Sequence, residues 1–284
     1  MLKYTGNLKM DEENTGLREV SKSVIELMER IYLNNLNQGE YSIEITDKTI
    51  INELKNASSI EEKNDVLIKH EKKAMYPFYA KKCFIRLLGD FCLYMYESLH
   101  NLFEYKPQIA YTLARKPLID DIFYLQYLYV DADKAVDLIL SDDAKDKDVG
   151  TRKNRALDKE HSDIIIKDLG YKDNIFYRLR YEETVYGILY NCNKAMHISI
   201  IRNDVQNTES GELNFIFMED RVIEDFTKLY LHTVPTLLFY VAMIILKISE
   251  RINGKDVFLE NELETLQDVF TDLIANKGNR EEEK

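Results

Sequence analysis

The chain has 284 residues, of which 45% are hydrophobic and 31% charged, a composition that allows a sizeable core and excludes a disordered chain. With only 10 glycines and 4 prolines, the sequence disfavours turn-rich β-sandwiches and barrels and favours long helices. The net charge of −12 disfavours general nucleic-acid binding, because such a surface repels phosphate backbones.

In the first half of the chain, hydrophobic periodicity predicts helices over about 15–36, 59–74, 77–104 and 107–130, after a frayed segment at 1–14. Residues 41–45 alternate like a short strand, and Asp47 suits the N-cap of a short helix that follows. Pro77 suits a first helical turn, whereas Pro117 lies inside a helical pattern and predicts a kink.

In the second half, Asp131 suits the cap of a helix to about 140, and the polar stretch 141–163 predicts an exposed loop leading into a helix that ends near Gly170. A tyrosine-rich helical region covers 173–192, and 197–218 reads as helix or hairpin. Long helices follow at 219–252 and 259–276, with a disordered tail at 277–284. We expect one all-α bundle over 15–276, with about eight to ten helices and at most one β-hairpin.

The chain is expected to be cytoplasmic. Its three cysteines lack CxxC spacing, which disfavours a disulfide framework or zinc ribbon, and the first residues show no apolar secretion signal. Residues 229–248 approach the length of a membrane span, but Pro235 and polar neighbours at helical spacing favour a buried core helix. We therefore expect no membrane contact.

A polar stripe runs along the predicted helix 77–104, on an otherwise apolar helix. It is either a narrow exposed face or a polar seam that forms a site, and its members are Lys82, Arg86, Asp90, Glu97 and His100. In the next helix, Asp121 falls on the apolar face and needs a partner, for which Arg86 and Arg115 are the candidates. The pair is either a structural ion pair or part of an active site.

The histidines offer a second group of candidates. His197 lies in an apolar stretch after a helix break, where it is a satisfied core residue or an acid–base group. Glu97 with His100 and Asp158 with His161 have the spacing of di-iron ligands, but such a site needs further carboxylates. We expect no metal and no cofactor, and the common nucleotide-binding motifs are missing from the sequence.

Arg155 and His161, six residues apart at a helix start, resemble the ribonuclease motif of HEPN domains. This resemblance implies that the two side chains act on the scissile phosphate and the 2′-hydroxyl of RNA. Over about 110–220, the segments 114–129, 196–199 and 213–216 resemble an uncharacterised family of bacterial all-helical proteins, loosely HEPN-like and grouped with defence systems. That family has an acid four residues after its arginine, where this chain has Ile119.

We predict a binding or regulatory module without catalysis, acting through an acidic, tyrosine-rich surface as a homodimer or with a protein partner. The alternative is a HEPN-like, metal-independent ribonuclease or bacterial defence effector, with RNA as its partner. Its candidate catalytic residues are His197, Arg115, Asp121 and Arg86, with Arg155 and His161 as the other pair.

Overall fold

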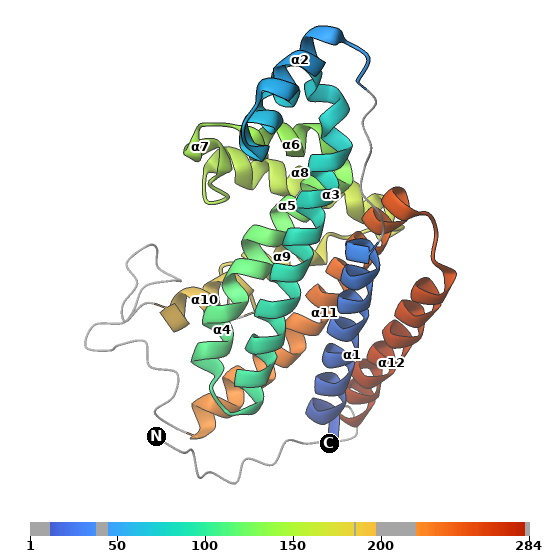
Figure 1. Cartoon of the computed structure of the whole chain (residues 1–284). Coiled ribbons are helices and arrows are strands. Elements are labelled where there is room, and N and C mark those ends of the chain that lie inside the picture. Colours follow the sequence, from blue (N-terminus) through green and yellow to red (C-terminus); the bar gives the residue numbers. More distant parts are fainter. Residues whose placement is uncertain (1–11, 38–44, 185, 197–219, 282–284) are drawn as a thin grey trace, which may run out of the picture.

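The computed structural model describes residues 12–37, 45–184, 186–196 and 220–281, which form helices and no strand (Figure 1). The predicted all-α fold is thereby confirmed. The predicted hairpin within 197–218, and all but the last residue of the predicted strand at 41–45, lie outside the described residues.

Twelve α-helices and one π-helix follow one another along the described chain, more than the eight to ten helices that the sequence predicts. Short helices such as those at 144–147 and 175–181 account for the difference, because they are too brief for a periodic pattern. In chain order the elements are α1 (Glu12–Asn37), α2 (Lys48–Asn56), α3 (Ile60–Phe103), α4 (Pro107–Arg115), η1 (Lys116–Asp121), α5 (Ile122–Val130), α6 (Ala132–Leu140), α7 (Ala144–Lys147), α8 (Arg152–Asp168), α9 (Ile175–Tyr181), α10 (Ile188–Met196), α11 (Asp220–Asn253) and α12 (Val257–Glu281).

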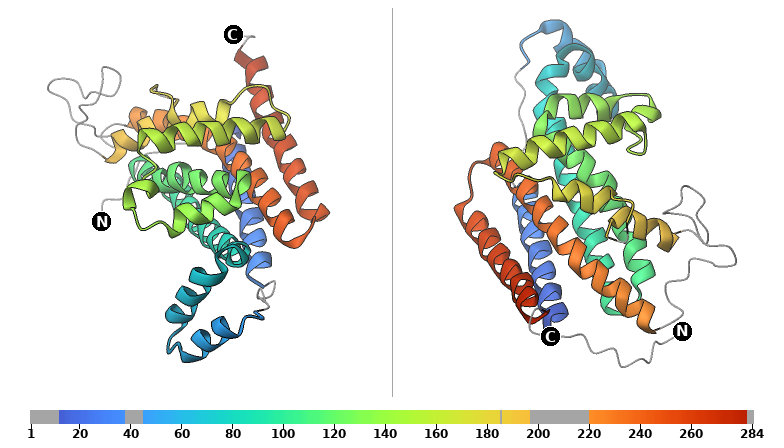
Figure 2. Two further views of the ribbon diagram at one scale, coloured as in Figure 1. Left: turned by 90° about the horizontal axis from the view of Figure 1, so that it is seen from above. Right: turned by 180° about the vertical axis from the view of Figure 1, so that it is seen from behind.

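Helix α3 runs the length of the molecule, with α4, η1 and α5 returning along one side of it and α1 lying on the other (Figure 1). Helix α11 packs behind α1, and α12 covers the outer side of α1 (Figure 2). One hydrophobic cluster joins buried residues from α1, α3, α4, α5, α8, α10, α11 and α12. The apolar stripes predicted from the sequence therefore meet in a shared core.

Three predicted boundaries are wrong. The break in α3 falls at Glu71 (φ −126°, ψ 36°), so Pro77 lies inside the second part of the helix rather than in its first turn. Helix α8 already begins at Arg152, where the Thr151 hydroxyl accepts a hydrogen bond from the Asn154 amide, so much of the predicted polar loop is helical. The last helix extends to Glu281, beyond the predicted end at 276.

The apolar segment 229–248 belongs to α11. Residues Val222–Asn253 are long and apolar enough to cross a membrane by length and composition alone, and 78% of their most apolar window is buried against the rest of the structure. A core helix of a soluble protein shows the same combination, so the cytoplasmic location stays a prediction.

The contact of α1 with α3 depends on Gly89. A Cβ atom at this position would lie 3.0 Å from Cε2 of Tyr32, closer than ordinary van der Waals contact. Glycine in a helix interior costs about 1 kcal/mol relative to alanine. Here the missing side chain leaves room for the Tyr32 ring across the face of α3.

We therefore expect Gly89→Ala to give no net stabilisation, because the gain in helix propensity is offset by the collision with Tyr32. In a Tyr32→Leu background the same substitution should stabilise the protein by up to about 1 kcal/mol. Urea unfolding of the four proteins of this double-mutant cycle measures the difference. Equal effects of Gly89→Ala in both backgrounds would contradict this account.

Candidate functional site

A groove of about 1340 Å³ lies along the outward face of α3. One wall is the C-terminal end of α1, and the other is formed by η1 with residues of α5, α6 and α7. This volume exceeds the range of about 300–1,000 Å³ that is usual for small-molecule sites, so the groove has ample room for a ligand.

The polar stripe predicted on α3 faces this groove over part of its length. Lys82, Arg86 and Asp90 line it, whereas Glu97 and His100 are exposed beyond its lining. The stripe is thus an exposed face and not an internal seam. Lys82 Nζ lies 5.7 Å from the ring centroid of Phe78, and Arg86 makes no ion pair with any described carboxylate.

The opposite wall carries a lysine shared by two carboxylates. The Lys116 ammonium contacts Asp90 of α3 and lies 3.1 Å from Asp121 Oδ1. The Asp121 partner expected from the sequence was Arg86 or Arg115, and this prediction is wrong. In a π-helix the hydrogen bonds join residues i and i+5, which brings Lys116 and Asp121 to one side.

Asp121 is nearly fully buried, with 3% of its surface exposed, yet its Oδ2 atom has no hydrogen-bond partner among the described residues. Burial raises the pKa of Asp121 to about 6, against the opposing effect of the Lys116 ammonium. Arg115 lies 3.8 Å from the carboxylate of Asp120, which also lines the groove. Burial raises the pKa of Asp120 as well, although Arg115 acts to lower it.

Element η1 exists because of Pro117. A proline inside an α-helix has no N–H to donate and its ring collides with the carbonyl four residues earlier, so the chain widens into a π turn. The predicted kink at Pro117 therefore takes the form of a π-helix. The carbonyl groups of Leu118 and Ile119 in this turn also accept hydrogen bonds from a donor outside the helix.

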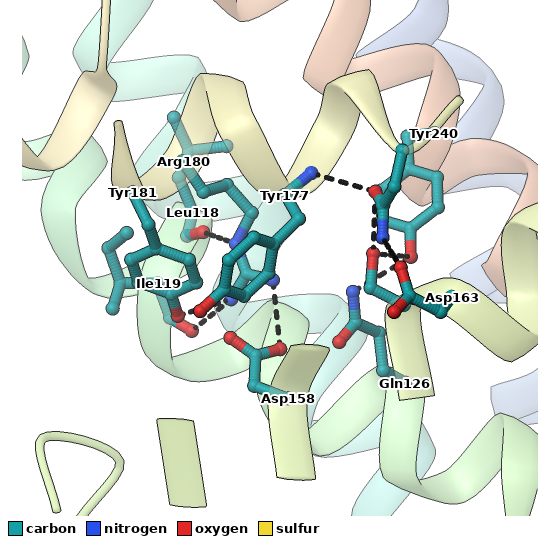
Figure 3. Close-up of polar contacts among 11 residues, drawn as sticks. Leu118, Ile119, Gln126, Asp158, Asp163, Tyr177, Arg180, Tyr181 and Tyr240 are labelled. Atoms are coloured by element: carbon teal, nitrogen blue, oxygen red, sulfur yellow. Dashed lines mark hydrogen bonds and ion pairs between the residues drawn. The ribbon is translucent and has the colours of Figure 1, made fainter. Parts of the chain in front are cut away.

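Those carbonyls are bound by a fully buried arginine (Figure 3). Arg180 Nε donates to the Leu118 carbonyl and Nη2 to the Ile119 carbonyl, both at 2.9 Å. Its Nη1 donates to Asp158 Oδ1 at 2.9 Å, and both side chains of this ion pair are completely buried. Burial disfavours the charged form, but the Asp158 carboxylate keeps the pKa of Arg180 above its ordinary value.

A polar network surrounds the ion pair. The Gln126 amide lies 2.8 Å from the Tyr240 hydroxyl, and it donates to Asp158 Oδ1 when its nitrogen faces that carboxylate. The Tyr240 hydroxyl in turn lies 3.4 Å from Ser162 Oγ, and burial raises the pKa of Tyr240 to about 12. The network therefore joins η1, α5, α8, α9 and α11 in the interior (Figure 3).

The other predicted site residues do not converge on the groove. The Arg155 guanidinium lies 4.1 Å from the ring centroid of Tyr181, whereas His161 lies against Tyr127, with ring centroids 4.6 Å apart. His161 is buried, contrary to the exposed charged loop that we expected, and burial lowers its pKa. His197 lies outside the described residues.

Sequence reasoning missed Arg180 and the role of Asp158. Arg180 lies in a tyrosine-rich helix with Arg178 beside it, and no pattern in the sequence distinguishes the buried arginine from the exposed one. The tyrosines of this region also pack inward, since Tyr190 is buried and Tyr181 half-buried. Among the described residues of 173–192, the expected tyrosine-rich surface is therefore reduced mainly to Tyr186.

The spacing of di-iron ligands does not produce a metal cluster in the described part of the chain. No group of three or more His, Cys, Asp or Glu side chains is placed there to hold a metal ion. Asp158 instead binds Arg180, and Glu97 and His100 are exposed.

The buried ion pair of Asp158 and Arg180 should make the largest contribution to the free energy of unfolding among the polar contacts that join α8 and α9 to η1. We expect Asp158→Leu to lower the free energy of unfolding by about 3–5 kcal/mol, because it leaves the Arg180 charge buried without its carboxylate. Adding Arg180→Met should restore only part of this loss, because the Leu118 and Ile119 carbonyls then lose their hydrogen bonds from the guanidinium. Urea unfolding measures each step. Removing an exposed pair by Glu26→Gln is the control, with an expected cost below about 1 kcal/mol.

Asp121 should make stability depend on pH. Its pKa of about 6 in the folded protein exceeds the ordinary aspartate value of 3.8, so the folded state binds more protons between these values. Its contribution is therefore fully present below about pH 4 and is lost as the pH rises through about 6. Asp121→Asn should remove this slope, a change of up to about 3 kcal/mol in urea unfolding across this range. The exposed Asp133→Asn should leave the slope unchanged.

Comparison with known proteins gives no family assignment. No protein-family model matches the chain, and no curated protein and no solved structure matches it. The HEPN-like resemblance, the bacterial defence role and the ribonuclease activity therefore stay predictions.

Proposed function

We propose that this protein is a binding or regulatory module that acts without catalysis and takes a small multivalent anion into the α3 groove. One observation carries the proposal. Lys82, Arg86 and Lys147 line the groove, and none of them makes an ion pair with a described carboxylate. These cations are unusual in a chain of net charge −12, where carboxylates outnumber basic side chains by 50 to 38.

Lys82 and Arg86 stand one turn apart on α3, at the spacing where like charges destabilise a helix by about 0.2–0.5 kcal/mol. An anion bound between them would turn this repulsion into attraction. The cationic side chains also concentrate a small anion locally, while the acidic remainder of the surface repels an extended polyanion. The arrangement therefore favours a compact ligand over nucleic acid.

The opposite wall provides a means of response. The Lys116 ammonium is held between Asp90 and Asp121 and lies on η1, the turn that Arg180 supports from the interior. An anion in the groove competes with these carboxylates for Lys116. Binding can therefore be communicated from the groove to the buried network, which suits a regulatory module.

The test is calorimetric titration of the full chain with pyrophosphate, citrate and ADP. We expect at least one of them to bind and to be recovered chemically unchanged. Lys82→Glu and Arg86→Glu should each weaken its binding at least about tenfold, because a hydrogen bond to a charged group contributes about 1.5–3 kcal/mol. Lys73→Glu is the matched control, since this lysine is exposed on the same helix and does not line the groove.

Two results would contradict the proposal. One is the failure of all three anions to bind, or binding that the two groove variants leave as tight as in the control. The other is chemical conversion of the bound compound by the protein, which would indicate an enzyme.

A further inference from the structure

Three groove residues form a row on α3. Phe78, Lys82 and Arg86 follow one another at intervals of four residues and all line the groove. Residues at this spacing share one face of a helix, and the row extends over roughly 12 Å at 1.5 Å per residue. An aromatic ring is thus followed by two cations along one side of the helix.

Phe78 is placed as a platform rather than as part of the core. Its side chain is half-buried, it does not belong to the hydrophobic cluster, and its ring meets the neighbouring Tyr79 edge-on, with centroids 5.4 Å apart. The Lys82 ammonium lies over the ring. A planar ligand ring can replace this ammonium on the Phe78 face, which leaves Lys82 to bind an anionic group.

Building on the proposed function, we propose that the groove binds a nucleoside phosphate, with its base on Phe78 and its phosphates at Lys82 and Arg86. Along α3 an aromatic ring is followed by two cations, which matches a compound in which a base is followed by phosphate groups. Stacking on an aromatic ring accepts any base, because every base has a π face. The Arg86 guanidinium offers the fork of donors that binds phosphate oxygens in pairs.

The chain contains its own reporter for this site. Cys83 lines the groove and is partly accessible, whereas Cys92 and Cys192 are buried. Burial raises the pKa of all three thiols, that of Cys92 to about 12 and that of Cys192 further, whereas the neighbouring Arg86 and Lys82 oppose the rise at Cys83. In the native protein, alkylation should therefore occur first at Cys83, next to Lys82 and one turn from Arg86.

The experiment follows N-ethylmaleimide modification of Cys83 by mass spectrometry at pH 8, with AMP, ADP, pyrophosphate or ribose 5-phosphate as the probe. We expect saturating ADP to slow the modification at least fivefold. ADP should also bind at least fivefold more tightly than pyrophosphate or ribose 5-phosphate in calorimetric titration, because of these three only ADP carries an aromatic base that can stack on Phe78.

Substitution of Phe78 separates the ring from the charges. Phe78→Ala should weaken ADP binding by about 5- to 100-fold, the range that stacking on an aromatic residue represents, and leave pyrophosphate binding unchanged. Phe78→Leu keeps apolar bulk without a π face and should weaken ADP binding nearly as much. Phe258→Ala removes a phenylalanine that is 70% exposed on α12 and serves as the matched control.

The outcomes distinguish this inference from the proposed function. If pyrophosphate or citrate binds as tightly as ADP and neither Phe78 variant changes ADP binding, the nucleoside phosphate is wrong and the anion groove stands. ADP that binds without protecting Cys83 also overturns the inference, because its site is then elsewhere. If none of the probes binds, both proposals fail.

Discussion

The structure depends on one guanidinium group buried where water cannot reach it. Arg180 can occupy this place only because the Asp158 carboxylate balances its charge and the Leu118 carbonyl, the Ile119 carbonyl and the Tyr181 hydroxyl accept further hydrogen bonds from it. Without such partners, burial of a charge costs far more than a single side chain can contribute to folding. Helices α8 and α9 are thereby tied to the turn between α4 and α5.

The turn η1 has an inner face that binds Arg180 and an outer face that lines the groove. Its backbone carbonyls point inward to Arg180, and its side chains Lys116, Asp120 and Asp121 line the groove. A site built on a rigid element is positioned more precisely than one on a free loop. The buried ion pair thus belongs to the architecture of the groove, although no ligand could touch it.

The sequence predicted the all-α fold, the main long helices, the irregular turn at Pro117 and the polar stripe on α3, because each follows from a local pattern. It did not predict that Asp158 and Arg180 would pair, because they lie 22 residues apart in segments that are polar or rich in tyrosine. The wrong partner for Asp121 has a related cause. An α-helical projection of 107–130 could not anticipate the extra residue that a π turn contains.

That extra residue makes the groove sensitive to the deletion of a single residue. A π turn holds one residue more than the α-helical turn it replaces, and each residue of a regular helix adds a rotation of 100°. Deleting any single residue from 116–121 would let α4 continue into α5 as one regular helix and rotate one flank of the turn relative to the other. Which side chains of η1 face the groove therefore depends on the number of residues in the turn. Loss of one codon could replace the charged side chains of this wall by the apolar side chains of the neighbouring helix face.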